Sequence, residues 1–403
     1  MKKILLLLAA VAGIFTGCVP PELTLRHLPE NPSAPLTVAA LLPLTGENRI
    51  YAEQMLEGLL AAESRINNQN GINGRRVKLL AIDTKGSASG SSEALQKAAS
   101  AGAVAAIAGY GHREVEMLTA HAAKLQMPMV LPVATGDSLT EISPFIYRSC
   151  FSDSQQMEVL ASYLFHWRQL TRGAIITDSG NNAEYSLNIA RHFTQAVKNN
   201  DCTIAVNCVI PQGSGLTGRQ LANLLAHDPQ FILIAASGRR AAEIFGKVRE
   251  GGFSGVLCGP ESWDDQEFLS ALGKSVIPGD TVFTAFFSEE NNSREFKRFR
   301  NEFRRRFYHQ PGACETQSYD ALCFLAIALN EAEDLFKFDR NWRSIRNHAG
   351  AGATYTMLPK GGIDRTIYLK NIGIREQNGK SYPYARLSKQ LQYSKIKDYR
   401  IIE

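Results

Sequence analysis

The chain has 403 residues, of which 44% are hydrophobic and 21% charged, with 44 Lys and Arg against 39 Asp and Glu. This length corresponds to about two domains, each large enough to bury a core. The composition argues against long disorder, collagen-like sequence and a polytopic membrane protein. The net charge of +5 is too small to indicate nucleic-acid binding, and two of the basic residues belong to the N-terminal segment considered next.

The N-terminus has the pattern of a targeting signal. Two lysines precede an apolar stretch from Ile4 to Phe15, the arrangement of a secretory signal peptide. The stretch is too short to span about 30 Å of hydrocarbon comfortably. Its end, Phe15-Thr16-Gly17-Cys18, resembles a bacterial lipobox, so we expect residues 1–17 to be removed and Cys18 to be lipidated. The alternative is an ordinary signal peptide with an incidental cysteine.

A proline-rich segment, residues 18–35, follows the expected lipidation site. Proline disfavours helix and favours extended chain, so we expect a semi-rigid tether. Beyond Cys18 the chain has six cysteines, which permit many pairings. Cys202 and Cys208 are close enough in sequence for a local disulfide, and free buried thiols are the alternative. Because no Cys or His cluster has zinc spacing, we expect no structural metal.

From Leu36 onward, short apolar runs alternate with segments of helical spacing. The expected strands are 36–42, 77–83, 104–108, 128–133, 173–178, 204–210, 231–236 and 256–259. The expected helices between them are 51–67, 92–101, 115–125, 185–198, 218–226 and 241–250. This alternation predicts an α/β protein with parallel sheets and right-handed crossovers. Gly58 lies on the apolar side of the first helix, where it allows close packing.

Parallel sheets of this kind bind ligands beyond the carboxyl ends of their strands. Small, glycine-containing and polar loops occupy those positions in this sequence. They are Pro43-Leu44-Thr45-Gly46, Gly109-Tyr110-Gly111-His112, Ala134-Thr135-Gly136, Asp178-Ser179-Gly180, Ser237-Gly238 and Gly259-Pro260-Glu261. Each loop could be a simple turn, but together they indicate a ligand site.

Common catalytic motifs do not occur. The sequence has no Gly-x-Ser-x-Gly and no His-Glu-x-x-His. Gly373 to Ser381 has five residues between its glycines, where a phosphate-binding loop needs four, and its Asn378-Gly379 predicts a hairpin turn. A helix over 293–307 combines four phenylalanines with seven basic residues. We expect its apolar face to pack in the core and its charges to face solvent, and an anionic partner is the alternative.

A series of short segments in a fixed order resembles the type I periplasmic-binding-protein family, in particular the leucine/isoleucine/valine-binding branch that serves ABC transporters. The resemblance covers about Leu36 to Gly379. Its segments include Leu42-Pro43-Leu44-Thr45-Gly46, Asn70-Gly71-Ile72-Asn73-Gly74, Met127-Pro128, Tyr147-Arg148, Gly259-Pro260-Glu261 and Tyr319-Asp320-Ala321.

The resemblance implies two Rossmann-like lobes joined by three crossover segments, with a ligand cleft between the lobes that closes by hinge motion. The crossings are expected near Tyr147-Arg148, within 280–287 and within 354–363. The N-terminal lobe would comprise residues 36–147 and 287–353, and the C-terminal lobe residues 148–286 and 354–403.

The resemblance also implies ligand-binding residues. Ala134 and Thr135 would contact a ligand carboxylate, Tyr185 would cover the ligand, and Glu261 would pair with its ammonium group. Tyr51 borders the first loop of the cleft, and Ser237 stands where some members of the family have an aromatic residue.

One loop departs from the family pattern. After Gly109 the family usually offers a serine to the ligand carboxylate, at the N-terminus of a helix. This sequence has His112 and Arg113 there instead. We hypothesise a ligand with extra negative charge or a larger polar group that meets Arg113; the alternative is that Arg113 faces solvent.

The expected function is therefore that of an extracytoplasmic, lipid-anchored solute-binding protein on the inner or outer membrane. It would capture an amino-acid-like compound for an ABC permease, without enzymatic activity, cofactor, metal or nucleic acid. The alternative is a regulatory lipoprotein with the same fold, such as a penicillin-binding-protein activator that contacts a cell-wall synthase.

Overall fold

A computed structural model describes residues 28–29, 31–180, 182–200, 202–272, 280–377 and 380–396. The expected signal peptide, Cys18 and most of the tether lie outside these residues. The end of the tether contacts the body of the protein, because Arg75 Nε donates to the carbonyl oxygen of Ala34 at 2.9 Å. No helix within the described ranges is long and apolar enough to cross a membrane.

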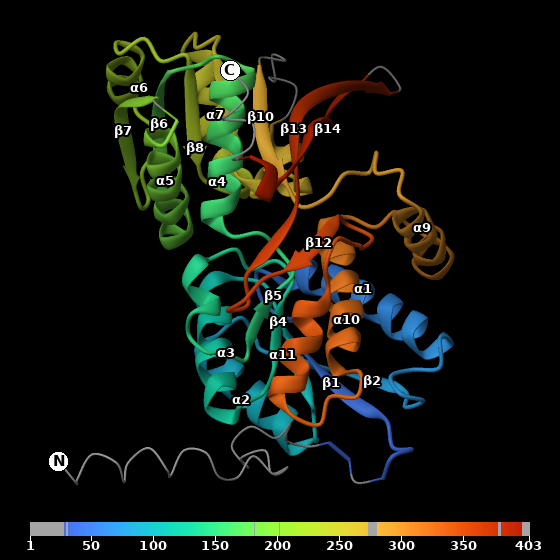
Figure 1. Cartoon of the computed structure of the whole chain (residues 1–403). Coiled ribbons are helices and arrows are strands. Elements are labelled where there is room, and N and C mark those ends of the chain that lie inside the picture. The colour runs from blue at the N-terminus through green and yellow to red at the C-terminus, as the bar shows by residue number, and fades with distance from the viewer. Residues whose placement is uncertain are drawn as a thin grey trace, which may run out of the picture.

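Two lobes lie one above the other, each built around a twisted sheet (Figure 1). The strands of the first lobe's sheet have the order β2-β1-β3-β4-β5, and all pair in parallel. They are β1 (Leu36–Leu42), β2 (Val77–Asp83), β3 (Ala105–Ala108), β4 (Met129–Leu131) and β5 (Ile146–Arg148). Parallel pairing over short apolar runs is what the sequence predicts.

The second lobe repeats this order. Its parallel strands have the order β7-β6-β8-β9-β10, to which β13 is added in antiparallel pairing. They are β6 (Arg172–Ser179), β7 (Thr203–Pro211), β8 (Phe231–Ala235), β9 (Val256–Gly259), β10 (Thr281–Ala285) and β13 (Ile363–Gln377), with β11 (His348–Ala349), β12 (Thr354–Met357) and β14 (Lys380–Gln392) on β13 and its neighbours. The mixed α/β fold with two sheets confirms the predicted fold class.

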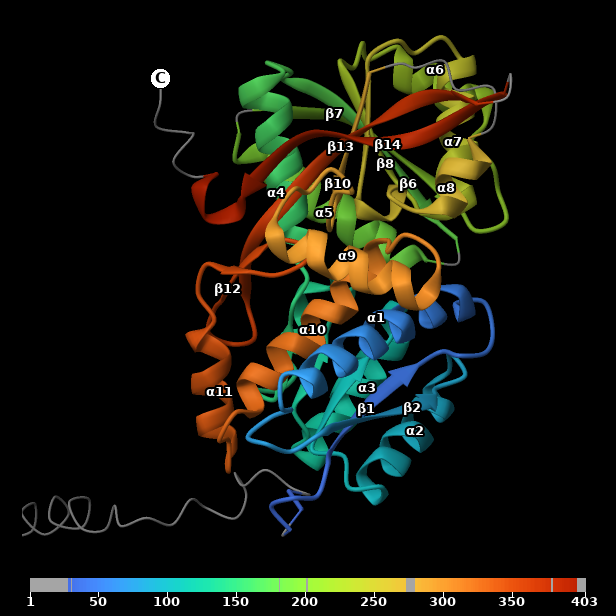
Figure 2. The same cartoon turned by 90° about the vertical axis from the view of Figure 1, so that its right-hand side faces the viewer.

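Helices cover both faces of each sheet. They are α1 (Arg49–Asn68), α2 (Ala88–Ser100), α3 (His112–Leu125), α4 (Asp153–Ser162), α5 (Ala183–Lys198), α6 (Gly218–Leu225), α7 (Gly238–Glu250), α8 (Gln266–Ala271), α9 (Arg294–Phe307), α10 (Ala313–Leu329) and α11 (Leu335–Ser344). Short helical turns lie at Asp137–Thr140, Tyr163–Trp167, Glu261–Trp263 and Tyr393–Lys395. Figure 2 shows α9, α10 and α1 together on one side of the first lobe.

The core follows from the two-residue period of the strands. In β1, Val38 and Ala40 face a core cluster that includes Met55 of α1, whereas Ala39 and Leu41 face a separate cluster that includes residues of α2 and α3. Successive side chains of a strand point to opposite faces, so a run that is apolar throughout must be covered on both sides. This explains why β1 is an unbroken apolar run.

The chain passes between the lobes in three places in the described part of the structure. The passages follow β5, follow β10, and lie between β12 and β13. The last helices of the first lobe, α9 to α11, therefore come late in the sequence, after the whole of the second parallel sheet (Figure 1). The lobe boundaries assigned from the sequence stay a prediction.

Several predicted elements differ in their ends. Helix α2 begins at Ala88, four residues before the predicted start at Ser92, because Ser87 caps it by accepting from the amide of Gly90 at 3.1 Å. Helix α7 begins at Gly238 rather than Ala241. Strand β4 is shorter than the predicted 128–133.

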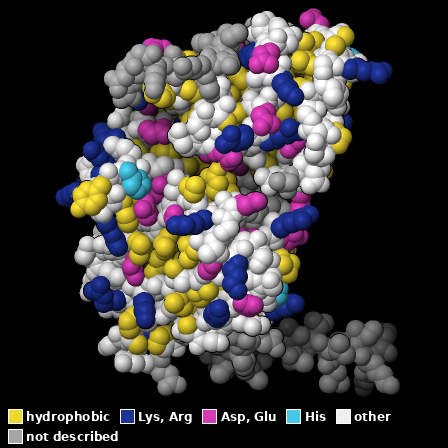
Figure 3. Space-filling view, turned by 180° about the vertical axis from the view of Figure 1, so that it is seen from behind, with side chains coloured by type: hydrophobic (Ala, Val, Ile, Leu, Met, Phe, Trp, Pro, Cys, Tyr) yellow, Lys and Arg dark blue, Asp and Glu magenta, His cyan; other side chains and the backbone are white. Residues whose placement is uncertain are grey.

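The hairpin and the basic helix agree with expectation. Strands β13 and β14 pair in antiparallel register as far as Gln377 and Lys380, as expected for a hairpin, and the turn predicted at Asn378-Gly379 lies outside the described residues. In α9, Phe296, Phe299 and Phe303 are buried, while the basic residues mostly face solvent. Figure 3, which views the molecule from behind Figure 1, shows basic and acidic side chains interspersed on that face.

Among the described residues, five cysteines are free thiols: Cys150, Cys208, Cys258, Cys314 and Cys323. Cys202 precedes β7 and forms no disulfide with Cys208. Burial raises the pKa of the Cys150 thiol to about 11, so it is packed as an apolar side chain. The local disulfide considered between Cys202 and Cys208 does not form in the structure.

Candidate functional site

The strand order places one cleft between the lobes. In each parallel sheet the chain leaves the first strand in one direction and later returns to its other side, so the order reverses between β1 and β3 and between β6 and β8. Loops diverge at such a reversal and leave room for a ligand at the carboxyl ends of the strands. The loops after these strands face one another across a cleft of about 170 Å³.

Residues of both lobes line this cleft. They are Asn48, Tyr51, Tyr110, Gly111, Val133, Ala134, Thr135, Asn182, Tyr185, Ser237, Glu261, Ser262, Asp264, Asp265, Phe286, Ala313 and Cys314. The structure therefore brings together six of the residues singled out in the sequence: Tyr51, Ala134, Thr135, Tyr185, Ser237 and Glu261.

Glu261 lies just after β9, at the start of a short helical turn. Its Oε1 accepts from the hydroxyl of Tyr185 at 2.9 Å, while its Oε2 is buried with no hydrogen-bond partner in the structure. Burial and the nearby carboxylate of Asp153 raise the pKa of Glu261 from 4.5 to about 7. A buried carboxylate oxygen without a donor is costly, and a ligand cation in the cleft would satisfy it.

A pair of stacked tyrosines forms the wall opposite. Tyr51 of α1 and Tyr110 after β3 have ring centroids 4.3 Å apart and planes inclined by 9°. The hydroxyl of Tyr51 donates to Oδ2 of Asp265 at 3.1 Å. Because Tyr51 belongs to the first lobe and Asp265 to the second, this hydrogen bond joins the lobes across the cleft.

Asp264 is neutralised from outside the cleft. Lys370 of β13 is fully buried and donates from Nζ to both carboxylate oxygens of Asp264, at 2.9 and 2.8 Å. It also lies 3.2 Å from Glu289 and over the ring of Phe287. Although burial raises the pKa of Asp264, the ion pair with Lys370 opposes that effect. A charge-paired Asp264 adds little net charge to the site.

The wall formed by Ala134 and Thr135 is held in place by hydrogen bonds to its backbone carbonyl groups. Arg148 Nη1 donates to the Thr135 carbonyl at 3.2 Å, and the amide of Asp153 donates to the same oxygen at 2.9 Å. The thiol of Cys150 lies 3.2 Å from the Ala134 carbonyl oxygen. These bonds fix a backbone segment that lines the cleft, as precise recognition of a small ligand requires.

The loop that departs from the family pattern contributes backbone rather than charge. Gly111 lines the cleft with φ at +107°, a conformation that favours glycine, and it precedes the first turn of α3. Arg113 is exposed and is not among the lining residues. The side chain of His112 lies outside the description. The structure thus does not bring Arg113 to the ligand site.

Sequence reasoning missed part of the lining. Asp264 and Asp265 follow Glu261 in one loop. Tyr110 lies in one of the loops that were predicted to follow a strand. Attention to every polar or aromatic residue of those loops would have found them. Phe286, Ala313 and Cys314 come from the later part of the chain, and no local sequence pattern predicts that they line the cleft.

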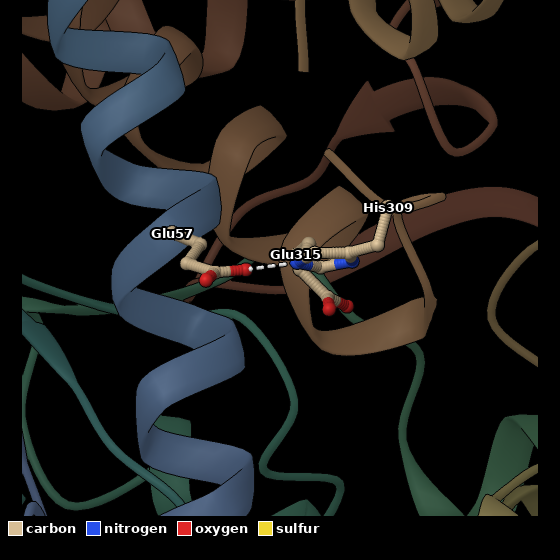
Figure 4. A group of neighbouring side chains, drawn as sticks. All are labelled: Glu57, His309 and Glu315. Carbon is tan, nitrogen blue, oxygen red and sulfur yellow. Dashed lines mark hydrogen bonds and ion pairs between the residues drawn. The ribbon is translucent and has the colours of Figure 1, made fainter. Parts of the chain in front are cut away.

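A further group of polar side chains lies apart from the cleft lining. Among the described residues, Glu57, His309 and Glu315 are the group whose ligand atoms, all within 4.8 Å of one another, could hold a metal ion (Figure 4). Each has another role in the structure. His309 Nε2 lies 2.9 Å from Glu57 Oε2 as an ion pair, and Glu315 accepts from the amide of Gly312 at 3.0 Å to cap α10.

The sequence and fold match known binding proteins. Residues 35–351 match the family model described as periplasmic binding protein. The Leu/Ile/Val-binding protein BraC3 of Rhizobium johnstonii is 29% identical over 252 residues, which are 62% of this chain and 67% of that protein. The chain belongs to the periplasmic binding protein family, whose members are extracytoplasmic solute-binding proteins.

Solved structures share the fold. The leucine-binding protein LivK of Thermotoga maritima superposes with a TM-score of 0.74 at 20% identity, covering 88% of this chain and 98% of that one. The branched-chain amino acid transporter substrate-binding protein LivJ of Streptococcus pneumoniae, solved with isoleucine, gives a TM-score of 0.72 at 19% identity, covering 88% and 100%. The type I two-lobed architecture is thereby confirmed.

Proposed function

We propose that this protein captures a small amino-acid-like ligand in the cleft between its lobes and presents it to an ABC importer, without catalysing a reaction. The observation that carries the proposal is Glu261, whose buried Oε2 has no partner in a cleft that both lobes line. An ammonium group is the natural partner for such an oxygen. The relatives BraC3 and LivJ, which are named for binding or transporting branched-chain amino acids, support this reading.

The rest of the cleft fits the other end of an amino acid. Gly111 and Thr135 lie in the lining, and Gly111 precedes a helix of fourteen residues. The N-terminus of a helix attracts anions because its first amide groups are unpaired and its dipole is positive there. We propose that the ligand carboxylate lies at this end and that Ala134, Tyr185 and Ser237 shape the space between.

The N-terminal sequence supports a location outside the cytoplasm for this function. The apolar N-terminal segment and Cys18 support export and a lipid anchor, so the lobes would work outside the cytoplasm beside a membrane-bound permease. A regulatory lipoprotein that contacts a cell-wall synthase would not require a complete small-ligand cleft. The intact lining therefore favours ligand capture.

The test is isothermal titration of the lobes against the proteinogenic L-amino acids. Glu261→Gln should weaken the best ligand at least about tenfold, because a charge-assisted hydrogen bond is replaced by a neutral one. Glu47→Gln, at an exposed acid outside the lining, is the matched control and should leave the affinity unchanged.

The pH dependence gives a second readout. The titratable groups near Glu261 include Asp153, Tyr185, Tyr110 and Cys150, and the pKa of Glu261 in the empty cleft is about 7. Since the ligand ammonium pairs with the ionised form, affinity should fall by up to about tenfold for each pH unit below 7 and level off above it. Unchanged binding by Glu261→Gln would overturn the proposal.

A further inference from the structure

The charged residues of the cleft wall are all of one sign. Among the lining residues that the structure describes, three are acidic, namely Glu261, Asp264 and Asp265, and none is Lys, Arg or His. Lys370 neutralises Asp264 from behind. No salt bridge within the described residues joins Glu261 or Asp265 to a basic side chain. Two carboxylates therefore face the ligand space without a protein cation.

Asp265 is held in place as an acceptor. Its Oδ1 accepts from the amide of Phe268 at 2.7 Å, which caps α8, and its Oδ2 accepts from the hydroxyl of Tyr51 at 3.1 Å. Each carboxylate oxygen has a second lone pair, so these bonds orient the group without saturating it. Capping α8 explains a polar residue here, but Ser, Thr or Asn would cap equally well and carry no charge.

The aromatic wall favours the same kind of ligand. Tyr51, which touches Asp265, stacks on Tyr110, and both rings line the cleft. The face of an aromatic ring carries partial negative charge and attracts a cation within about 6 Å. A positive group placed beside Asp265 would thus meet a carboxylate and tyrosine rings together.

We infer that the cleft selects a cationic amino acid, with the α-ammonium at Glu261 and a second positive group at Asp265 and the Tyr51–Tyr110 pair. The inference rests on the proposed function, because it takes the Glu261 end of the site as given. A neutral branched side chain would leave the carboxylate of Asp265 without a cationic partner, which is costly in a site of low dielectric constant.

The experiment compares near-isosteric ligands that differ in side-chain charge. Titrations use L-arginine against L-citrulline and L-lysine against L-norleucine on the wild type, Asp265→Asn and Glu267→Gln. The wild type should bind each cationic ligand at least about tenfold more tightly than its neutral partner. Asp265→Asn should reduce that ratio to near one, because Asn removes the charge and still caps the helix.

Glu267→Gln is the matched control, because Glu267 is an exposed acid two residues away that does not line the cleft. It should retain the full ratio. A wild type that binds neutral ligands as tightly as cationic ones, or an Asp265→Asn variant that keeps the preference, overturns this inference and leaves the proposed function standing. Failure of all four amino acids to bind overturns the inference, whereas the proposed function falls only if no proteinogenic amino acid binds or if Glu261→Gln leaves binding unchanged.

Discussion

At the scale of single residues, Glu261 combines a functional position with an energetic cost. Its carboxylate is held by Tyr185 on one oxygen only, and its pKa is raised to about 7 by burial and by Asp153. The folded protein therefore binds a proton more tightly at this site than the unfolded chain does. Stability conferred on the protonated form is lost as the pH rises from about 4.5 through 7. Binding sites commonly retain such costs because the ligand offsets them.

We therefore expect Glu261→Gln to stabilise the empty protein at high pH. At pH 8 the free energy of unfolding should rise by about 2 kcal/mol, a value discounted for partial solvent access, because the amide needs no ionisation. Near pH 4.5 the gain should be small, since Glu261 is protonated in the folded state and still about half protonated in the unfolded chain, where its pKa is 4.5. Urea denaturation at the two pH values measures the difference.

The control for this prediction is Glu47→Gln, which removes an exposed charge. It should change stability by less than about 0.5 kcal/mol at either pH. If Glu261→Gln had the same stability as the wild type at pH 8, the carboxylate would be ionised without cost in the empty cleft. That result would remove the physical basis for its raised pKa.

The sequence predicted the residues of the site best where they stand next to a predicted strand or helix. Glu261, Thr135 and Tyr185 stand in loops at strand ends or on the first turn of the helix that follows, and the structure places all three in the lining. For Arg113 the sequence left two alternatives, contact with the ligand or exposure to solvent, because side-chain direction at the start of a helix depends on packing that no local pattern reveals. The structure shows the second alternative, because Arg113 is exposed.

At the scale of elements, α1 and α10 approach more closely than side chains would permit. An added methyl group at Gly58 of α1 would lie 2.1 Å from the backbone carbonyl oxygen of Glu315 in α10. The helical spacing in the sequence indicated Gly58 as a point of close packing, although the partner helix is more than 250 residues away and could not be identified.

Gly58→Ala should therefore destabilise the protein, because the obstructing atom is backbone and the helices must separate. We expect a loss of about 2 kcal/mol or more, typical of overpacking. Gly246→Ala in α7 is the matched control, since its methyl group would meet nothing within 4 Å. It should stabilise by about 0.5–1 kcal/mol through helix propensity. Thermal unfolding of both variants decides, and equal effects would show that α1 and α10 tolerate separation.

The first turn of α2 shows a limit of prediction from local sequence. Residues 88–91 read Ala-Ser-Gly-Ser, a poor helix by propensity, yet they form the first turn of α2 because Ser87 caps it. Gly90 then packs against the carbonyl of Thr84, where its missing side chain is required. Tertiary contact and capping overrode propensity at this turn.

At the scale of the whole molecule, Arg365 links the three passages between the lobes. It is fully buried at the start of β13. Its guanidinium donates to the Ser149 carbonyl at 3.1 Å, just after β5, and to the Phe286 carbonyl just after β10. The same group lies 4.8 Å from the ring centre of Tyr355 on β12. One side chain thus ties together segments whose relative positions set the arrangement of the lobes.

The sequence located these passages by family resemblance and could not locate the side chain that joins them. Arg365 stands in an ordinary strand pattern, and its partners are 79 and 216 residues away. A buried arginine has no local signature, because its partners are backbone carbonyl groups contributed by distant turns. The contact becomes visible only when all the passages are placed in space.

Arg365→Met tests whether this link holds the molecule together. Methionine fills similar volume but donates no hydrogen bond, so the carbonyls of Ser149 and Phe286 would lose their charged donor in the interior. We expect unfolding to become easier by about 3 kcal/mol, partly offset by the loss of a buried charge. Arg346→Met, at an exposed arginine, should change stability by less than about 0.5 kcal/mol. Urea denaturation compares the two variants. Equal unfolding curves would mean that strand pairing alone holds the lobes in place. An arginine that held the three passages together could not be replaced with so small a change in the free energy of unfolding.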